Sequence, residues 1–170
     1  MKDSVLRQTR ALGVSLAASG VVAIIGGVAT SRGLGAWYEA LRKPAWNPPS
    51  WIFGPVWTLL YVLMAVAAYV VWRAGFALGA AGEVRRRANV ALVVYAVHLA
   101  FNALWSWVFF AWQSPGWAVL EIGVLWVLIL VTIALFARIR PMAGWILVPY
   151  AAWVTFAAFL NFTLWRLNAA

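Results

Sequence analysis

The chain has 170 residues, of which 66% are hydrophobic and only 10% are charged, and its formal net charge is +9. A soluble domain carries about 25% charged residues, so the composition excludes that class and indicates an integral membrane protein. Cysteine is absent and histidine occurs once. Disulfides, thiolate nucleophiles and thiolate metal sites are therefore excluded, and no metal centre is predicted.

Five apolar runs are each long enough to cross a hydrocarbon core of about 30 Å as a helix. They span residues 11–31, 51–72, 88–112, 116–137 and 141–165. We expect one domain over 1–170, an all-α bundle of five transmembrane helices, because the alternation typical of a β-barrel is missing. Lys2, Arg7 and Arg10 precede the first run, as in a secretory signal. Its apolar part exceeds the roughly 7 to 15 residues of such a segment, and we interpret it as a retained helix.

Basic residues set the predicted topology. Nine Lys/Arg residues lie at the end that holds the N-terminus and four at the other; the nine are Lys2, Arg7, Arg10, Arg73, Arg85, Arg86, Arg87, Arg138 and Arg140, and the four are Arg32, Arg42, Lys43 and Arg166. The positive-inside rule then places the N-terminus in the cytoplasm if the protein lies in a plasma membrane. We interpret the run 85–87 as an orientation signal, with lipid-headgroup binding as the alternative.

The longest predicted connection, residues 32–50, includes a short helical segment at 37–42 and the stretch KPAWNPP at 43–49. Proline fixes its own φ and pushes the preceding residue out of the helical region, which predicts a stiff, extended strap at 44–49. Long ordered loops are more often lids or binding elements than spacers. We therefore interpret 32–50 as a lid, and Pro55 and Trp57, one turn inside the second helix, as part of a shaped wall.

One face of the third predicted helix is polar and aromatic, with residues at spacings of three and four: Tyr95, His98, Asn102, Trp105 and Phe109. Amide and imidazole groups are costly in lipid unless they meet a partner or a cavity, so this face should point into the bundle. The opposite side carries Ala96, Ala100 and Ala103. Small residues four apart allow helices to approach closely, which suggests a homodimer interface there.

Three features have competing interpretations. His98, with Asn102 one turn further on, is interpreted as a hydrogen-bonded core pair, with axial haem ligation as the alternative. Glu121 lies near the start of the fourth helix, where the helix dipole lowers the free-energy cost of placing a carboxylate in the membrane. We interpret it as a packing residue with a polar partner, and a proton or cation relay is the alternative. A small-residue stripe on the first helix is interpreted as intramolecular packing: Ala11, Ser15, Ser19, Ala23 and Gly27.

Motifs spread over residues 11–168 together carry a family resemblance. They are Trp37-Tyr38, Lys43-Pro44-Ala45-Trp46-Asn47-Pro48-Pro49, Trp57, Phe101-Asn102-Ala103-Leu104-Trp105-Ser106, Phe109-Phe110, Gly116-Trp117-Ala118, Val148-Pro149-Tyr150 with Trp153, Leu160-Asn161, and Trp165-Arg166-Leu167-Asn168. This combination resembles the TspO/MBR family of tryptophan-rich sensory proteins, whose animal members are the translocator proteins, or peripheral benzodiazepine receptors.

The resemblance implies a five-helix bundle, often a homodimer, that binds porphyrin and, in some members, sterols or synthetic isoquinoline and benzodiazepine-type ligands, without a covalent cofactor. By position, the ligand pocket would comprise Trp37, Tyr38, Pro48, Trp57, Tyr61, His98, Asn102, Trp105, Trp153 and Ala157. Two positions depart from the family pattern. His98 stands where glutamine is common, and Phe162 replaces the tyrosine of a sterol-recognition stretch, so tight sterol binding is not predicted.

Three functions remain as expectations. The first is a membrane tetrapyrrole-binding sensory or regulatory protein involved in porphyrin handling, because rigid aromatic walls suit a flat macrocycle. The second is a light-dependent porphyrin-degrading enzyme, for which the resemblance implies Trp57 and Trp153 as catalytic residues. The third is a transporter of porphyrin or sterol, ranked last because five helices cannot divide into equal repeats. The basic charge lies in the connections, so membrane lipid, and no nucleic acid, is the expected partner.

Overall fold

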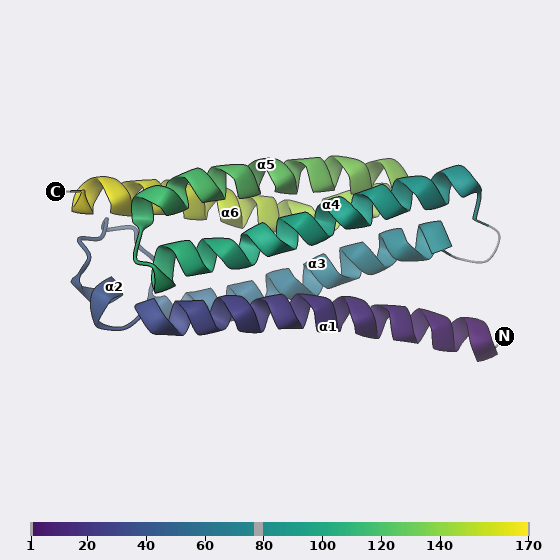
Figure 1. Cartoon of the computed structure of the whole chain (residues 1–170), viewed down its shortest axis with the longest axis horizontal. Helices are drawn as coiled ribbons and strands as arrows, with labels where there is room; N and C mark the ends of the chain where they lie inside the picture. The colour runs from purple at the N-terminus through teal and green to yellow at the C-terminus, as the bar shows by residue number, and fades with distance from the viewer. Residues whose placement is uncertain (1, 77–79, 170) are drawn as a thin grey trace.

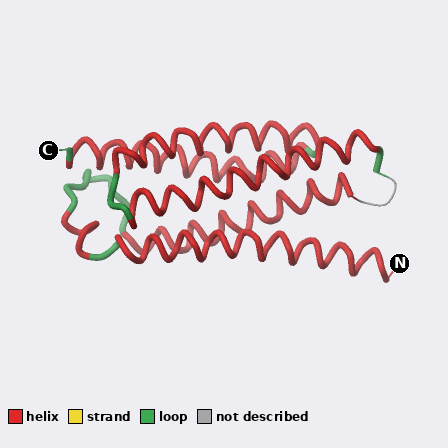
Figure 2. Tube along the Cα trace, viewed as in Figure 1, coloured by secondary structure: helices red, strands yellow, loops and turns green. Residues whose placement is uncertain are grey.

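Five long helices run side by side along one axis (Figures 1 and 2). The computed structural model describes residues 2–76 and 80–169. The long helices are α1 (Lys2–Gly33), α3 (Phe53–Phe76), α4 (Gly82–Ser106), α5 (Pro115–Ile139) and α6 (Pro141–Asn168), joined by the short helix α2 (Ala36–Ala40) and the helical turns η1 (Ser50–Ile52) and η2 (Trp107–Ala111). Each of the five long helices is long and apolar enough to cross a membrane. The predicted five-helix bundle is confirmed, and the chain is a multi-pass integral membrane protein.

Most helix ends lie past their predicted bounds, because hydropathy marks the apolar part of a helix and overlooks polar turns that continue it. The start of α3 at Phe53 and the end of α4 at Ser106 instead fall short of them and adjoin the helical turns η1 and η2. α1 begins at Lys2 and α4 at Gly82, so the basic run 85–87 forms helical turns at the start of α4. There Glu83 pairs with Arg86 at 3.0 Å and with Arg87 at 2.7 Å. Such exposed pairs add little stability.

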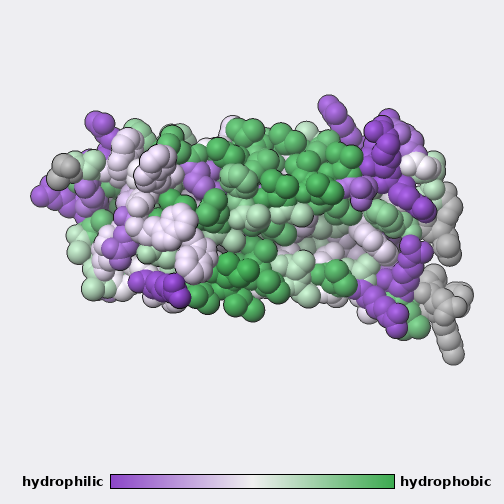
Figure 3. All heavy atoms as spheres, viewed as in Figure 1, coloured by the Kyte–Doolittle hydropathy of each residue, from purple (hydrophilic) through white to green (hydrophobic). Residues whose placement is uncertain are grey.

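The two ends of the bundle carry different connections. The N-terminus lies at the same end as the links between α3 and α4 and between α5 and α6, while the 34–49 loop and the C-terminus lie at the opposite end (Figure 1). A hydrophobic surface fills the space between hydrophilic ends on the face seen in Figure 3. This distribution suits a bundle with its long axis across the bilayer.

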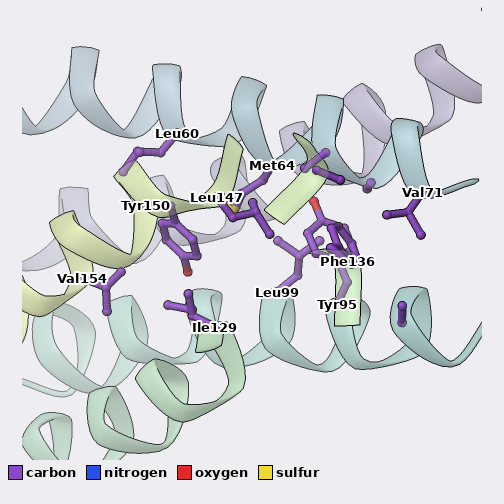
Figure 4. Packing of buried hydrophobic residues seen from close by; sticks show 14 of the residues in the cluster. Leu60, Met64, Val71, Tyr95, Leu99, Ile129, Phe136, Leu147, Tyr150 and Val154 are labelled. Carbon is purple, nitrogen blue, oxygen red and sulfur yellow. The ribbon is translucent and has the colours of Figure 1, made fainter. Parts of the chain in front are cut away.

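The main core lies between α3, α4, α5 and α6, where aromatic and aliphatic side chains interlock (Figure 4). Met64, Leu99, Phe136, Leu147 and Tyr150 are all less than a tenth exposed. The predicted polar and aromatic face of α4 points into this core, as expected. α1 is the least buried of the five helices, so it covers the bundle without filling its interior.

Gly33, at the end of α1, packs against the backbone of η2. A Cβ added at Gly33 would overlap the carbonyl of Phe110, whereas one added at Gly13 would meet nothing within 4 Å. We expect Gly33→Ala to lower the unfolding temperature clearly, because backbone must move to admit the methyl group. Gly13→Ala should be neutral or slightly stabilising, since alanine favours a helix by about 1 kcal/mol over glycine. Thermal unfolding in detergent compares the two, and equal midpoints would contradict this packing.

Candidate ligand-binding cavity

A cavity of about 660 Å³ lies between α1 and α3, with α4 and α6 at its back. Its volume is within the roughly 300 to 1,000 Å³ of pockets that hold drug-sized ligands. Side chains from α3 and α6 give it an aromatic wall, and α1 supplies small residues. The cavity is mostly apolar, so it suits a ligand with a large apolar surface.

Half of the predicted pocket residues line this cavity: Trp57, Tyr61, Trp105, Trp153 and Ala157. The other half lie elsewhere: Trp37, Tyr38 and Pro48 belong to the loop end of the bundle, and His98 and Asn102 lie in the core behind the wall. The prediction placed all ten residues on one surface. The structure separates them into a cavity wall and two supporting layers.

The loop residues pack against η2, which keeps them out of the cavity lining. Trp37 meets Phe109 edge-on at 5.7 Å between ring centroids, and Tyr38 lies 5.9 Å from Phe110. The Tyr38 hydroxyl donates to Asn47 Oδ1 at 3.0 Å. Burial of the hydroxyl is the main influence on the pKa of Tyr38 and raises it. The hydrogen bond to Asn47 lowers the pKa, but by less.

The predicted strap at 44–49 is only partly extended. The Asn47 N–H donates to the carbonyl of Pro44 at 3.0 Å, which closes a turn inside the strap. The expectation of an extended strap is therefore wrong at residues 45 and 46, because Ala45 and Trp46 are neither proline nor followed by proline and remain free to turn. Trp46 nevertheless reaches α6, where its ring lies 5.9 Å from that of Phe156.

Asn168, on the last turn of α6, fastens the loop. The Arg42 N–H donates to Asn168 Oδ1 at 2.9 Å, and Asn168 Nδ2 donates to the Arg42 carbonyl at 3.0 Å. On the loop itself, Lys43 Nζ donates to the carbonyls of Glu39 and Leu41 and lies 4.8 Å from the ring of Tyr38. The loop is thus held by bonds at its centre as well as by its proline residues.

A buried polar network supports the cavity wall. Tyr61 donates to Asn102 Oδ1 at 2.6 Å, and Asn102 Nδ2 donates to the Tyr150 hydroxyl at 2.9 Å. His98 Nε2 lies 3.3 Å from the same hydroxyl, and the two rings stack with centroids 5.3 Å apart. His98 and Asn102 therefore share Tyr150 as a partner instead of pairing with each other. His98 is fully buried and does not line the cavity.

Asn161 holds the Trp105 ring in the cavity wall. Trp105 Nε1 donates to Asn161 Oδ1 at 3.0 Å, and Asn161 Nδ2 donates to the carbonyl of Pro115 at 2.9 Å. The indole also stacks on Phe109, with ring centroids 5.3 Å apart. One amide on α6 therefore orients a side chain of α4 and ties α6 to the first residue of α5.

Two buried polar groups have no hydrogen-bond partner within the described parts of the chain: the indole N–H of Trp153 and the carboxyl of Glu121. Trp153 lies in the cavity wall, between Phe53 and Phe156. Glu121 is 9% exposed and borders a separate pocket near Trp112 and Trp117. The predicted polar partner of Glu121 is not found among the described residues: Ser114 lines the same pocket, but neither carboxyl oxygen has a hydrogen bond.

The sequence reasoning missed the wall that α1 contributes. Ser19, Ala23 and Gly27, assigned to helix packing, line the cavity, as does Gly26. A Cβ at Gly26 would lie 3.3 Å from Ser106 Oγ and 3.7 Å from the Tyr61 hydroxyl. The stripe of small residues was the available signal, but such a stripe looks the same whether helices close on it or leave space.

The predicted dimer residues on α4 differ in exposure. Ala96 and Ala100 lie on the exposed side, together with Val93 and Val97, whereas Ala103 is only 9% exposed and packs within the bundle. Ala103 is therefore removed from the expected interface. The angle around the helix does not explain the difference, because Ala103 is seven residues from Ala96 and only about 20° away from it. Ala103 instead lies farther along α4, near its end at Ser106, where neighbouring side chains cover it.

The fold and the cavity define a class: five-helix integral membrane proteins with an aromatic pocket. The TspO/MBR family model matches residues 14–166. The chain is 38% identical over 168 residues to the tryptophan-rich protein TspO of Chlorobaculum tepidum, covering 99% of both chains. It is 41% identical over 132 residues to the tryptophan-rich sensory protein of Cereibacter sphaeroides, and the match covers 78% of this chain and 77% of that protein. It is 36% identical over 132 residues to the human translocator protein, and the match covers 78% of this chain and 75% of that protein. The chain belongs to the TspO/MBR family.

Proposed function

We propose that the protein binds a tetrapyrrole, a porphyrin, within the membrane and acts as a sensory or regulatory protein in porphyrin handling. The observation that carries this proposal is the cavity of about 660 Å³ with Trp57, Tyr61, Trp105 and Trp153 in its walls. A flat, largely apolar macrocycle gains from such walls through stacked and edge-on contacts, worth about 0.5 to 1.5 kcal/mol per aromatic pair beyond area burial.

The indole N–H of Trp153 adds a polar argument. A buried donor without a partner costs about 1 to 3 kcal/mol, and a ligand acceptor that displaced the side chains covering this N–H would satisfy it. If the protein lies in a plasma membrane, the excess of basic residues at the N-terminal end of the bundle favours a cytoplasmic N-terminus. The cavity then opens near the opposite membrane surface, because Leu34, Ser50 and Trp51 border it at the end that carries the long loop.

A titration with protoporphyrin tests this function. Purified protein in detergent should show saturable quenching of tryptophan fluorescence, with Trp57→Phe and Trp153→Phe weakening the affinity about threefold to tenfold. Trp145→Phe is the matched control, because Trp145 is 73% exposed and lies outside the cavity lining. Quenching that does not saturate, or that weakens equally in all three variants, would refute binding in this cavity.

The second candidate is light-dependent breakdown of the bound porphyrin. It is favoured by the presence of Trp57 and Trp153 in one cavity, on the neighbouring helices α3 and α6, from which either indole could exchange an electron with an excited ligand. Illumination should then bleach the porphyrin band in the wild type, and less in Trp57→Phe and Trp153→Phe loaded to equal occupancy. A dark sample is the control. An unchanged band in the illuminated wild type would eliminate the enzyme.

A homodimer is the proposed assembly, with Ala96 and Ala100 of α4 at its interface. The chain has no cysteine, so a single introduced cysteine is its only thiol. Ala96→Cys and Ala100→Cys should form disulfide-linked dimers on mild oxidation in membranes. Val127→Cys, on the exposed side of α5, is the control that should remain monomeric. Equal crosslinking at all three positions, or none at the two alanine positions, would contradict the interface.

A further inference from the structure

A continuous line of side chains connects the cavity wall to α5. Tyr61, in the wall, donates to Asn102, which donates to Tyr150, and Tyr150 faces His98 Nε2 at 3.3 Å. His98 Nδ1 lies 3.5 Å from Thr132 Oγ1. Every member beyond Tyr61 is at most 2% exposed. The line therefore begins at the ligand cavity and ends in the protein interior.

Thr132 decides the direction of the hydrogen bonds. Its hydroxyl lies 2.7 Å from the carbonyl oxygen of Leu128 and 3.5 Å from His98 Nδ1. A hydroxyl has one proton, which goes to the much nearer acceptor. Thr132 Oγ1 therefore presents only lone pairs to the imidazole, and Nδ1 must carry the ring proton to meet them. A fully buried imidazolium is costly, and no described residue gives His98 an acidic hydrogen-bond partner, so His98 is neutral and its Nε2 is an acceptor.

This tautomer fixes each remaining link. Tyr150 donates its proton to His98 Nε2, so its oxygen accepts from Asn102 Nδ2. Asn102 then turns its Oδ1 toward Tyr61, which donates at 2.6 Å. The reverse order would need the proton on Nε2 and a flipped Asn102 amide. It would leave the lone pairs of Nδ1 and Thr132 Oγ1 facing each other.

We propose that Thr132 and His98 make Tyr61 an acceptor subsite, so that the cavity selects ligands with an N–H or O–H donor at this wall. Tyr61 has given its only proton to Asn102, and its oxygen retains lone pairs on the side of Gly26, which also lines the cavity. A ligand ether or carboxylate oxygen would meet these lone pairs and be disfavoured. Thr132 and His98 are positioning residues, because neither lines the cavity.

The direction can be tested without any ligand. His98 is the only histidine of the chain, so ¹⁵N-histidine labelling gives the signals of one imidazole. We expect the neutral tautomer with its proton on Nδ1 in the wild type and in Thr132→Ser, which keeps a hydroxyl. In the nearly isosteric Thr132→Val, Nδ1 loses its acceptor and the signals should move toward the Nε2–H tautomer. An Nε2–H wild type would overturn the proposed direction, and an unchanged tautomer in Thr132→Val would overturn the role of Thr132 in setting it.

Selectivity is tested with matched ligands, and this step rests on the proposed function. The probes are a porphyrin bearing 1-hydroxyethyl groups and the same porphyrin with those hydroxyls methylated. The wild type should bind the hydroxyl form about fivefold to tenfold more tightly. The preference should persist in Thr132→Ser and His98→Gln, because an amide also offers one donor and one acceptor. It should fall in Thr132→Val and vanish in Tyr61→Phe.

The two experiments separate the possible failures. If no porphyrin binds, the proposed function fails, while the imidazole spectrum still decides the direction of the hydrogen bonds. If both porphyrins bind equally well to the wild type, the acceptor subsite is refuted and porphyrin binding stands. A preference that survives unchanged in Tyr61→Phe would also refute it, because the discrimination would then come from the size of the methyl ether.

Discussion

Replacing Ala23 with phenylalanine should lower porphyrin affinity about 30-fold or more while leaving the bundle folded. Ala23 lies on α1 and lines the cavity opposite the aromatic wall. A benzyl group there would occupy the space of the macrocycle and remove one face of its stacking. A steric conflict of about 2 kcal/mol corresponds to this loss. α1 is the least buried helix, so its backbone can accept a larger side chain without disrupting the main core.

The matched control is Ile24→Phe at the next position, whose side chain is 68% exposed and points away from the cavity. Fluorescence titration gives the affinities, and thermal unfolding verifies that both variants are folded. Retained affinity in Ala23→Phe would place the ligand outside this cavity. Equal losses in both variants would indicate a general effect on α1.

Glu121→Met should stabilise the protein, which is the opposite of the usual effect of changing a buried residue. Both carboxyl oxygens are buried without a partner among the described residues. An unsatisfied buried polar group costs about 1 to 3 kcal/mol, and methionine fills a similar volume with a flexible apolar chain. For a chain of this size, each kcal/mol gained raises the unfolding temperature by about 2 to 4 °C.

Thermal unfolding in detergent measures this effect against two comparisons. Glu121→Gln keeps the shape and an unsatisfied polar head, so it should gain less than Glu121→Met. Leu120→Met changes the exposed neighbouring position and should be nearly neutral. A lower unfolding temperature in Glu121→Met would mean that the carboxyl has a stabilising partner. A stabilised variant that has lost porphyrin binding or breakdown would indicate that the carboxyl is retained for function.

The helices and the inward face of α4 were predictable because both depend on local rules. Length and hydropathy determine which segments can span a bilayer, and the three and four spacing of Tyr95, His98 and Asn102 defines a single face. Which polar side chains would pair with one another was harder to predict from the sequence. His98 and Asn102 were predicted to pair, yet both bind Tyr150, which lies 52 residues from His98. That contact depends on how α6 packs, which spacing within α4 does not contain.

The cavity was only half predictable for a related reason. Large aromatic residues such as Trp57 and Trp153 are visible in a sequence, whereas empty space is formed by residues that contribute little. Gly26 and Ala23 would look the same in a tightly packed helix pair. Pro48 shows the converse error. It was predicted to line the pocket as part of a lid, but the strap turns between Pro44 and Asn47 and contacts α6 through Trp46, and Pro48 does not line the cavity.

The bonds between Arg42 and Asn168 also affect the order in which the protein is completed during synthesis. Arg42 is made 126 residues before its partner, which at about 5 to 20 residues per second is a delay of about 6 to 25 s. Throughout that time the loop lacks these two hydrogen bonds to α6. The earlier helices are thus inserted with the loop end of the cavity unfastened at Arg42, and a chain that ended before residue 168 would lack this closure even after release.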